Sequence, residues 1–103
     1  SHMDYKLLSD EESQPTLTEM TAKAIEMLER NPNGFVLLVE GGRIDTSHHR
    51  NQAHLALGEV VEFHKAVEYV KANTNEEETL IVATADHSHP FTIGGYLVRF
   101  IVF

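Results

Sequence analysis

The spacing of apolar residues along the chain predicts two amphipathic helices. The first begins at Thr16, and its apolar positions fall on one face as Leu17, Met20, Ala24, Met27 and Leu28. Thr16 and Glu19 have the spacing of a capping box, and the turn residues at 31–34 end the helix. A longer amphipathic pattern predicts a second helix over residues 51–72.

Two continuous apolar runs have the composition of buried strands. They cover residues 35–39 and 79–85, and turn residues bound the first of them. The order strand, helix, strand is typical of a right-handed βαβ unit, whose two strands end at the same edge of a sheet. We therefore predict the α/β class, with a βαβ unit at its centre.

Composition narrows the partners that the chain can have. Its 103 residues suffice for one small hydrophobic core. Sixteen acidic against eight basic residues give a formal charge of -8, which opposes binding to nucleic acid. The absence of cysteine excludes a thiolate metal site, and no apolar run has the length of a transmembrane segment.

The two ends differ from the middle of the chain. Residues 1–15 are polar and are expected to form a lead-in loop, and Ser1-His2-Met3 is typical of the remnant of a purification tag. The last segment, 91–103, is expected to form either a further strand or an exposed tail, and residues 100–103 are entirely apolar.

Residues with metal-binding side chains follow both predicted strands. Those after the first are Glu40, Asp45, His48 and His49, and those after the second are Asp86, His87 and His89. Ligands of open α/β sheets bind beyond the carboxyl ends of the strands, where these residues would meet. A helical turn at 45–49 would also place Asp45 and His49 on one face, although this spacing alone is weak evidence.

The donor chemistry of these residues allows two kinds of ion. Carboxylate and imidazole ligands without thiolate suit Zn²⁺, and a carboxylate with waters suits Mg²⁺. Paired metals can stabilise the attacking and leaving oxygens of a phosphate ester. The pattern therefore favours metal-dependent hydrolysis.

Several motifs together resemble the alkaline phosphatase family. They are V-E-G-G-R-I-D at 39–45, H-H at 48–49, T-A-D-H-S-H at 84–89, R-N-P-x-G-F at 30–35 and F-x-x-G-G-Y at 91–96. The resemblance covers about residues 15–99. It implies a partial α/β domain at 16–99, taken from a larger doubly wound, mainly parallel sheet, with a divergent apolar tail at 100–103.

The resemblance also implies a role for each candidate residue. Glu40 would bind Mg²⁺, Asp45 with His49 would bind one Zn²⁺, and Asp86 with His87 would bind a second Zn²⁺. His89 would orient a ligand carboxylate. His48 is the alternative to His49 if the helix starts one residue differently, but the family register favours His49. The Asp-Ser pair that carries the family's nucleophile does not occur in this sequence.

Two hypotheses of function follow. The chain is a segment of a metal-dependent phosphomonoester hydrolase that supplies parts of two Zn²⁺ sites and one Mg²⁺ site, all incomplete here, and is inactive alone. The alternative is a non-catalytic metal-binding or protein-interaction module derived by truncation. We expect self-association through exposed sheet edges. The family resemblance implies an extracellular, lipid-anchored cell-surface or periplasmic location.

Overall fold

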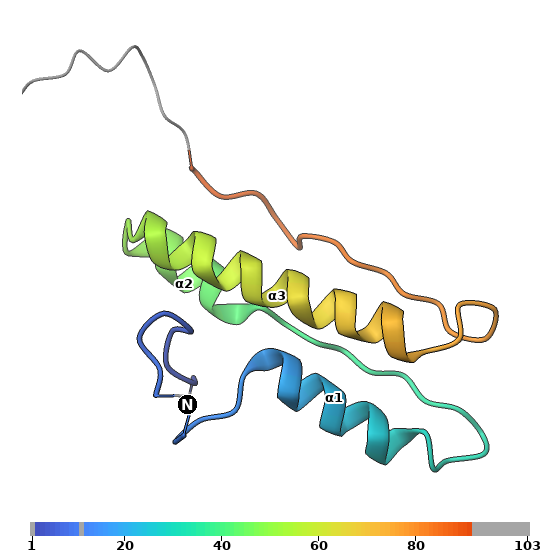
Figure 1. Ribbon diagram of the computed structural model, residues 1–103. Coiled ribbons are helices and arrows are strands. Elements are labelled where there is room, and N and C mark those ends of the chain that lie inside the picture. Colours follow the sequence, from blue (N-terminus) through green and yellow to red (C-terminus); the bar gives the residue numbers. More distant parts are fainter. Residues whose placement is uncertain (1, 11, 92–103) are drawn as a thin grey trace, which may run out of the picture.

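Three helices form the framework of the described part of the chain (Figure 1). The computed structural model describes residues 2–10 and 12–91. Helix α1 spans Leu17–Leu28, α2 spans Gly42–His49 and α3 spans Ala53–Asn73. Both α1 and α2 pack against α3, so the longest helix lies at the centre of the molecule. The two predicted helices are confirmed as α1 and α3, with boundaries within a few residues.

The beginning of α1 follows from its sequence. The hydroxyl oxygen of Thr16 accepts a hydrogen bond from the Glu19 amide at 3.1 Å, and the Glu19 carboxylate accepts one from the Thr16 amide at 2.8 Å. These reciprocal bonds form the predicted capping box. After α1 the chain turns at Gly34, whose φ of 79° is a left-handed conformation that glycine adopts without steric cost.

A buried carboxylate joins α1 to α3. Glu62 of α3 is 4% exposed and accepts hydrogen bonds from the amide of Thr18 at 3.2 Å and from its hydroxyl at 2.9 Å. The negative charge lies at the N-terminal end of α1, where the helix dipole favours an anion. Ile25 and Thr21 of α1 are also buried. The two helices are thus held together by apolar packing and by a charged cap.

The lead-in segment packs against the helices as a loop. Tyr5 is 7% exposed, and the guanidinium of Arg43 lies 4.5 Å from the centre of its ring. The same guanidinium donates from Nε to the carbonyl oxygen of Met3 at 2.7 Å. The amide of Lys6 donates to Glu59 of α3 at 2.6 Å. These contacts fix the start of the described chain beside α2 and α3.

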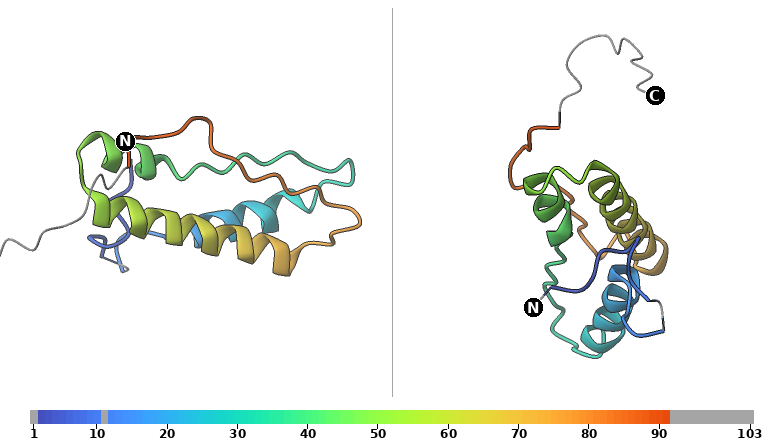
Figure 2. Two further views of the ribbon diagram at one scale, coloured as in Figure 1. Left: turned by 90° about the horizontal axis from the view of Figure 1, so that it is seen from above. Right: turned by 90° about the vertical axis from the view of Figure 1, so that its left-hand side faces the viewer.

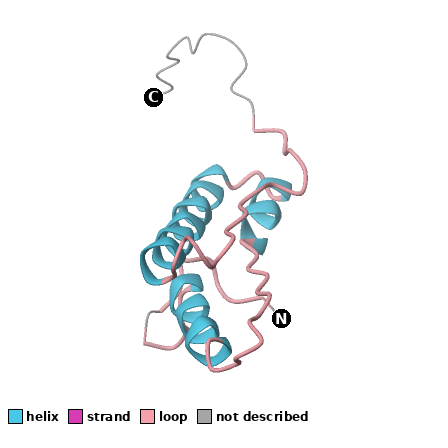
Figure 3. Ribbon diagram, turned by 90° about the vertical axis from the view of Figure 1, so that its right-hand side faces the viewer, coloured by secondary structure: helices cyan, strands magenta, loops and turns pink. Residues whose placement is uncertain are grey.

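The predicted sheet is wrong for the described residues. They contain helices and loops but no strand, so the βαβ unit and the α/β class are not observed (Figure 3). Residues 35–39 and 79–85 do run as extended segments in the same direction along α3 (Figure 1). Within the described chain, however, no backbone hydrogen bond joins one segment to the other. A parallel strand depends on such bonds to a neighbouring strand, and neither segment has that neighbour here.

The first extended segment, and residues 79–82 of the second, still have the alternating exposure of strands. In the first, Val36 is 97% and Leu38 is 91% exposed, whereas the residues between them are half-buried; in the second, Leu80 is 88% and Val82 is 74% exposed. Figure 2 shows both segments over the same side of α3. With α1 and α3, they line an apolar groove of about 550 Å³. One face of each segment therefore meets the helices and the other is open. Residues 92–103, where a further strand or tail is expected, lie outside the described residues.

Candidate metal centre

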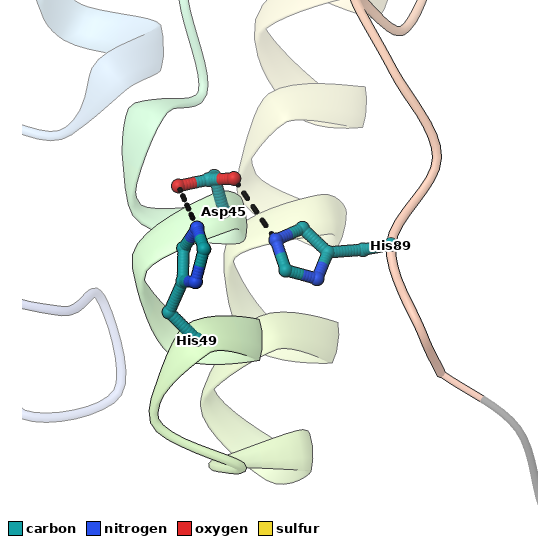
Figure 4. A group of neighbouring side chains, drawn as sticks. All are labelled: Asp45, His49 and His89. Carbon is teal, nitrogen blue, oxygen red and sulfur yellow. Dashed lines mark hydrogen bonds and ion pairs between the residues drawn. The ribbon is translucent and has the colours of Figure 1, made fainter.

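Helix α2 places the first pair of candidate ligands on one face. The Nε2 atom of His49 lies 3.4 Å from Oδ2 of Asp45, one helical turn earlier (Figure 4). Their side chains are 68% and 44% exposed, so both reach solvent. This is the helical arrangement that the sequence predicts, and the separation matches that of two donors on one tetrahedral zinc ion, about 3.3–3.5 Å for bonds of about 2.0–2.2 Å.

Local contacts keep α2 rigid although it is short. Ser47 is fully buried, and its hydroxyl lies 2.7 Å from the Arg43 carbonyl oxygen and 2.8 Å from that of Ile44. The helix ends at His49, and Asn51, with a φ of 55°, then turns the chain toward α3. Asparagine tolerates this left-handed conformation better than most residues. Helix α2, which carries Asp45 and His49, packs against α3.

His89 reaches the same carboxylate from a distant part of the sequence. Its Nε2 atom lies 3.0 Å from Oδ1 of Asp45, and its side chain is only 16% exposed (Figure 4). The ring of His48 stacks on it at 4.8 Å between centroids and 17° between planes, and His49 meets it edge-on at 4.7 Å. Pro90 follows directly and restricts the backbone of His89 to extended conformations. His89 is thus held firmly in place.

Asp45, His49 and His89 together form a candidate metal cluster. One donor atom from each lies within 4.8 Å of the other two, and no other such group of three occurs in residues 2–10 and 12–91. A carboxylate and two imidazoles are donors that Zn²⁺ accepts readily. The donor set therefore fits the metal that the sequence predicts.

A similar pair on α3 illustrates why the third donor matters. His64 and Glu68 are also four residues apart, and their Nε2 and Oε1 atoms lie 3.2 Å from each other. Both side chains are at least 67% exposed, and the pair belongs to no group of three donors in the described part of the chain. Helical spacing alone therefore does not make a metal site.

Asp86 and His87 lie beside this cluster on the extended segment. Nε2 of His87 is 3.4 Å from Oδ2 of Asp86 and 3.6 Å from Oδ1 of Asp45. The Nδ1–H of His87 donates to the Ser88 carbonyl oxygen at 2.9 Å. In the neutral ring this leaves the lone pair of Nε2 to bind a metal. Asp86 is 88% exposed and lies outside the group of three.

Glu40 occupies a different position from the other candidates. It is exposed at the start of α2, and its carboxyl carbon lies 3.5 Å from where a Cβ on Gly42 would be. It lines a separate hollow of about 270 Å³ between the lead-in and α2. The structure brings Asp45, His49, His87 and His89 together, with Asp86 next to His87, but it does not bring Glu40 into this cluster.

His48, which lies beside the cluster, has a packing role that the sequence did not indicate. His48 donates from Nδ1 to the Ile44 carbonyl oxygen at 2.7 Å, and its ring covers His89. The ring of Phe91 meets that of His48 edge-on, with 5.6 Å between centroids. The sequence predicts that His49 faces Asp45, but nothing in it indicates that His48 packs against His89.

The pKa of His87 is expected to lie above the ordinary value of 6.5 in the metal-free chain. The largest cause is the hydrogen bond to the Ser88 carbonyl, followed by the negative charge of Asp86, while Asp45 adds a smaller effect. An NMR titration should show the raised pKa, and Asp86→Asn should lower it without removing the shift. These contacts favour the charged ring, so they stabilise the fold below the unfolded-state pKa and are lost as pH rises through the folded-state pKa.

A variant remote from the cluster provides the control for this titration. Glu68→Gln should leave the titration of His87 unchanged, because Glu68 contacts His64 on α3 and not the cluster. A pKa of His87 at or below its ordinary value, or an increase on Asp86→Asn, would contradict the assigned causes.

Comparison with known proteins assigns the family. The model of the family described as "Alkaline phosphatase" matches residues 1–102. The membrane-bound alkaline phosphatase of Bombyx mori is 50% identical over 99 residues, which cover 96% of this chain and 18% of that protein. The tissue-nonspecific isozyme of alkaline phosphatase is 54% identical over 97 residues in Gallus gallus, with 94% of this chain and 19% of that protein covered.

The human tissue-nonspecific isozyme gives a closely similar result. It is 50% identical over 97 residues, covering 94% of this chain and 18% of the human protein. The chain therefore belongs to the alkaline phosphatase family, as the sequence motifs predict. It spans about a fifth of the length of these curated relatives.

Proposed function

We propose that this chain is a metal-binding segment of an alkaline phosphatase, a metal-dependent hydrolase of phosphate monoesters. The observation that supports this best is the convergence of Asp45, His49 and His89, whose donor atoms lie within 4.8 Å of one another. Asp45 and His49 come from α2, and His89 comes from a segment 40 or more residues later. Family membership supplies the reaction class, and the cluster supplies donors suited to its metals.

Each proposed ion has a set of ligands in this chain. Asp45 and His49 hold one Zn²⁺, Asp86 and His87 hold a second, and Glu40 contributes to an Mg²⁺ site. The 3.6 Å contact between His87 and Asp45 supports two neighbouring zinc positions. Glu40 lies apart from the other ligands, so the magnesium assignment rests on the sequence motif alone. All three sites require further ligands for complete coordination.

Bound metals would supply the positive charge that phosphate chemistry needs. The chain has a formal charge of -8 and would repel a phosphate dianion without them. Zinc ions also stabilise developing charge on the oxygens of a phosphate ester. No Asp-Ser pair occurs in the sequence, so hydrolysis is proposed for a longer protein that contains this segment and not for the segment alone.

The names of the relatives bear on location. One of them is described as membrane-bound, and we propose a cell-surface or extracellular location for the protein that contains this segment. Among the residues that the structure describes, no helix combines the length and the apolar character needed to span a bilayer.

Zinc calorimetry combined with a phosphatase assay tests this proposal. We expect Zn²⁺ to bind more weakly than to structural four-ligand sites, whose binding free energies are about 10–16 kcal/mol, because the ligand sets here are incomplete. We expect no turnover of p-nitrophenyl phosphate at alkaline pH with added Zn²⁺ and Mg²⁺. Absence of zinc binding would contradict the metal assignment. Turnover that Asp86→Ala abolishes would show instead that the isolated chain is catalytic.

A second candidate function is an interaction module that associates with other copies of itself. Val36, Leu38, Leu80 and Val82 are between 74% and 97% exposed on the open faces of the two extended segments. Their backbones make no hydrogen bond to each other within the described chain, so they retain the donors and acceptors of unpaired strands. A second copy carries segments of the same kind, and pairing would bury both the apolar side chains and the backbone groups.

A further inference from the structure

The two extended segments border the apolar groove over α3. In Figure 1 residues 35–39 pass below α3 and residues 79–83 pass above it, so the groove lies between them. Its volume of about 550 Å³ is within the range of about 300–1,000 Å³ that is usual for sites of bound molecules. Apolar side chains of the two long helices also line it, namely Ile25, Phe63, Ala66, Val67 and Val70.

The backbone along this groove has hydrogen-bonding capacity to spare. Within the described part of the chain, residues 35–39 and 80–83 make no backbone hydrogen bond. The edges that border the groove therefore have the donors and acceptors of unpaired strands. A strand placed between the two segments would pair with both edges at once, and backbone groups that are shielded from water need such partners.

The described chain ends at one end of this groove. The ring of Phe91 contacts that of His48 on α2, and α2 begins three residues after the first extended segment. Phe91 thus lies near the carboxyl ends of both segments. Residues 92–103 follow, outside the described residues, and Gly94-Gly95 is a typical turn signal in their sequence. A chain that reverses at these glycines would return along the groove, antiparallel to both segments.

The sequence of residues 97–103 suits a strand in this position. Alternate residues of a strand point to opposite faces, and one face of this stretch consists of Val98, Phe100 and Val102. These are residue types that favour strands. The only charged residue of the stretch, Arg99, belongs to the other face. At about 3.3 Å per residue, seven residues extend about 23 Å, and the five residues of the first segment extend about 17 Å.

We propose that residues 97–103 bind in the groove of their own chain, as an antiparallel strand between the two extended segments. Val98, Phe100 and Val102 pack on the apolar side chains of the helices, and Arg99 is directed to solvent. The family motifs in this part of the sequence end at Tyr96 and assign no role to the stretch that follows. The inference does not depend on metal binding. It also leaves the outer edges of both segments open to a second copy.

Tethering favours the chain's own segment over that of a second copy. Residues 92–96 form a short connection to the described chain, and short flexible linkers give effective concentrations in the millimolar range. A second copy at micromolar concentration has no such advantage. It must also approach against the repulsion between two chains of charge -8. Both effects make the intramolecular arrangement the expected one in dilute solution.

A nitroxide on the terminal stretch tests this placement. The chain contains no cysteine, so Ile101→Cys provides a single thiol for the label, on the face directed to solvent. When the same chain carries nitroxide and ¹⁵N and is diluted with unlabelled chain, the amide signals of residues 35–39 and 80–83 should broaden. When the two labels are on different chains, these signals should stay sharp.

The other results of this experiment contradict the proposal. Broadening only between different chains would show that a second copy fills the groove. Sharp signals in both samples would show that residues 97–103 do not bind there. Neither result bears on zinc binding, so the proposed function is tested separately.

Two neighbouring substitutions provide a matched pair in the labelled chain. Phe100→Gln removes apolar surface from the face directed to the groove and should lower the equilibrium constant for docking by about 10–100-fold. Arg99→Gln changes the opposite face and should leave this constant within about twofold. Far-UV circular dichroism should show equal helix content, because α1, α2 and α3 do not include these positions. Equal broadening in the two variants would overturn the proposal.

Discussion

The replacement of Asp45 with asparagine is expected to reduce zinc affinity by at least about 100-fold, the largest effect of any single substitution in this chain. Three imidazoles approach the carboxylate of Asp45, at 3.4 Å for His49, 3.6 Å for His87 and 3.0 Å for His89. Asparagine keeps the shape of the side chain and removes its charge. Calorimetric titration with Zn²⁺ at neutral pH measures the loss.

A matched control for this variant is available on α3. Glu68 forms the same kind of contact with His64, four residues away at 3.2 Å, but no third donor completes a group there. Glu68→Gln removes one negative charge, as Asp45→Asn does, and should leave zinc binding within about twofold, since surface charges at a distance are screened by salt. Equal losses in the two variants would mean that zinc binds nonspecifically to the acidic surface and not at Asp45.

The second large effect is expected in self-association. The combined variant with threonine at positions 36, 38, 80 and 82 should be monomeric at concentrations where the original chain forms dimers or larger species. All four side chains are at least 74% exposed, so their substitution removes apolar surface without opening the core. Size-exclusion chromatography with light scattering measures the mass. Added salt should strengthen association of the original chain, because it screens the repulsion between copies of charge -8.

Exposed apolar residues on the helices provide the comparison for this experiment. Met27 is 60% and Leu57 is 55% exposed, and they belong to α1 and α3 and not to the extended segments. The double variant Met27→Gln, Leu57→Gln should keep the oligomers of the original chain. A monomeric original chain at every accessible concentration would remove the basis for the interaction module, and loss of oligomers in both variants would show that association is not confined to the extended segments.

The helices could be predicted from the sequence because their determinants are local. The capping box of Thr16 and Glu19 and the apolar spacing of α1 and α3 depend on residues within a few turns of one another. The absence of the sheet could not be predicted from the sequence. The two apolar runs are extended and lie in the same direction, as strands would. Whether an extended segment is a strand depends on a neighbour of distant sequence, and apolar composition does not reveal whether that neighbour is present.

The candidate site was likewise predictable from the sequence only in part. Asp45 and His49 could be paired from their spacing alone, because a helix brings residues four apart together. The contact of Asp45 with His89 depends on the path of the chain through α3 and the second extended segment, and spacing cannot encode it. The family motifs predict a set of candidate residues but not the distances between them. Only the structure places His89 closer to Asp45 than His87, and Glu40 away from both.

The contact between Glu62 and Thr18 has a consequence for how the chain unfolds. Residue 62 is 44 positions later than residue 18, and its carboxylate supplies hydrogen bonds that the first turn of α1 cannot make within its own helix. When α3 melts, α1 loses this anion together with its apolar partner surface. The amide proton of Thr18 is therefore expected to exchange with solvent at a rate set by the opening of α3, which hydrogen-exchange NMR can measure.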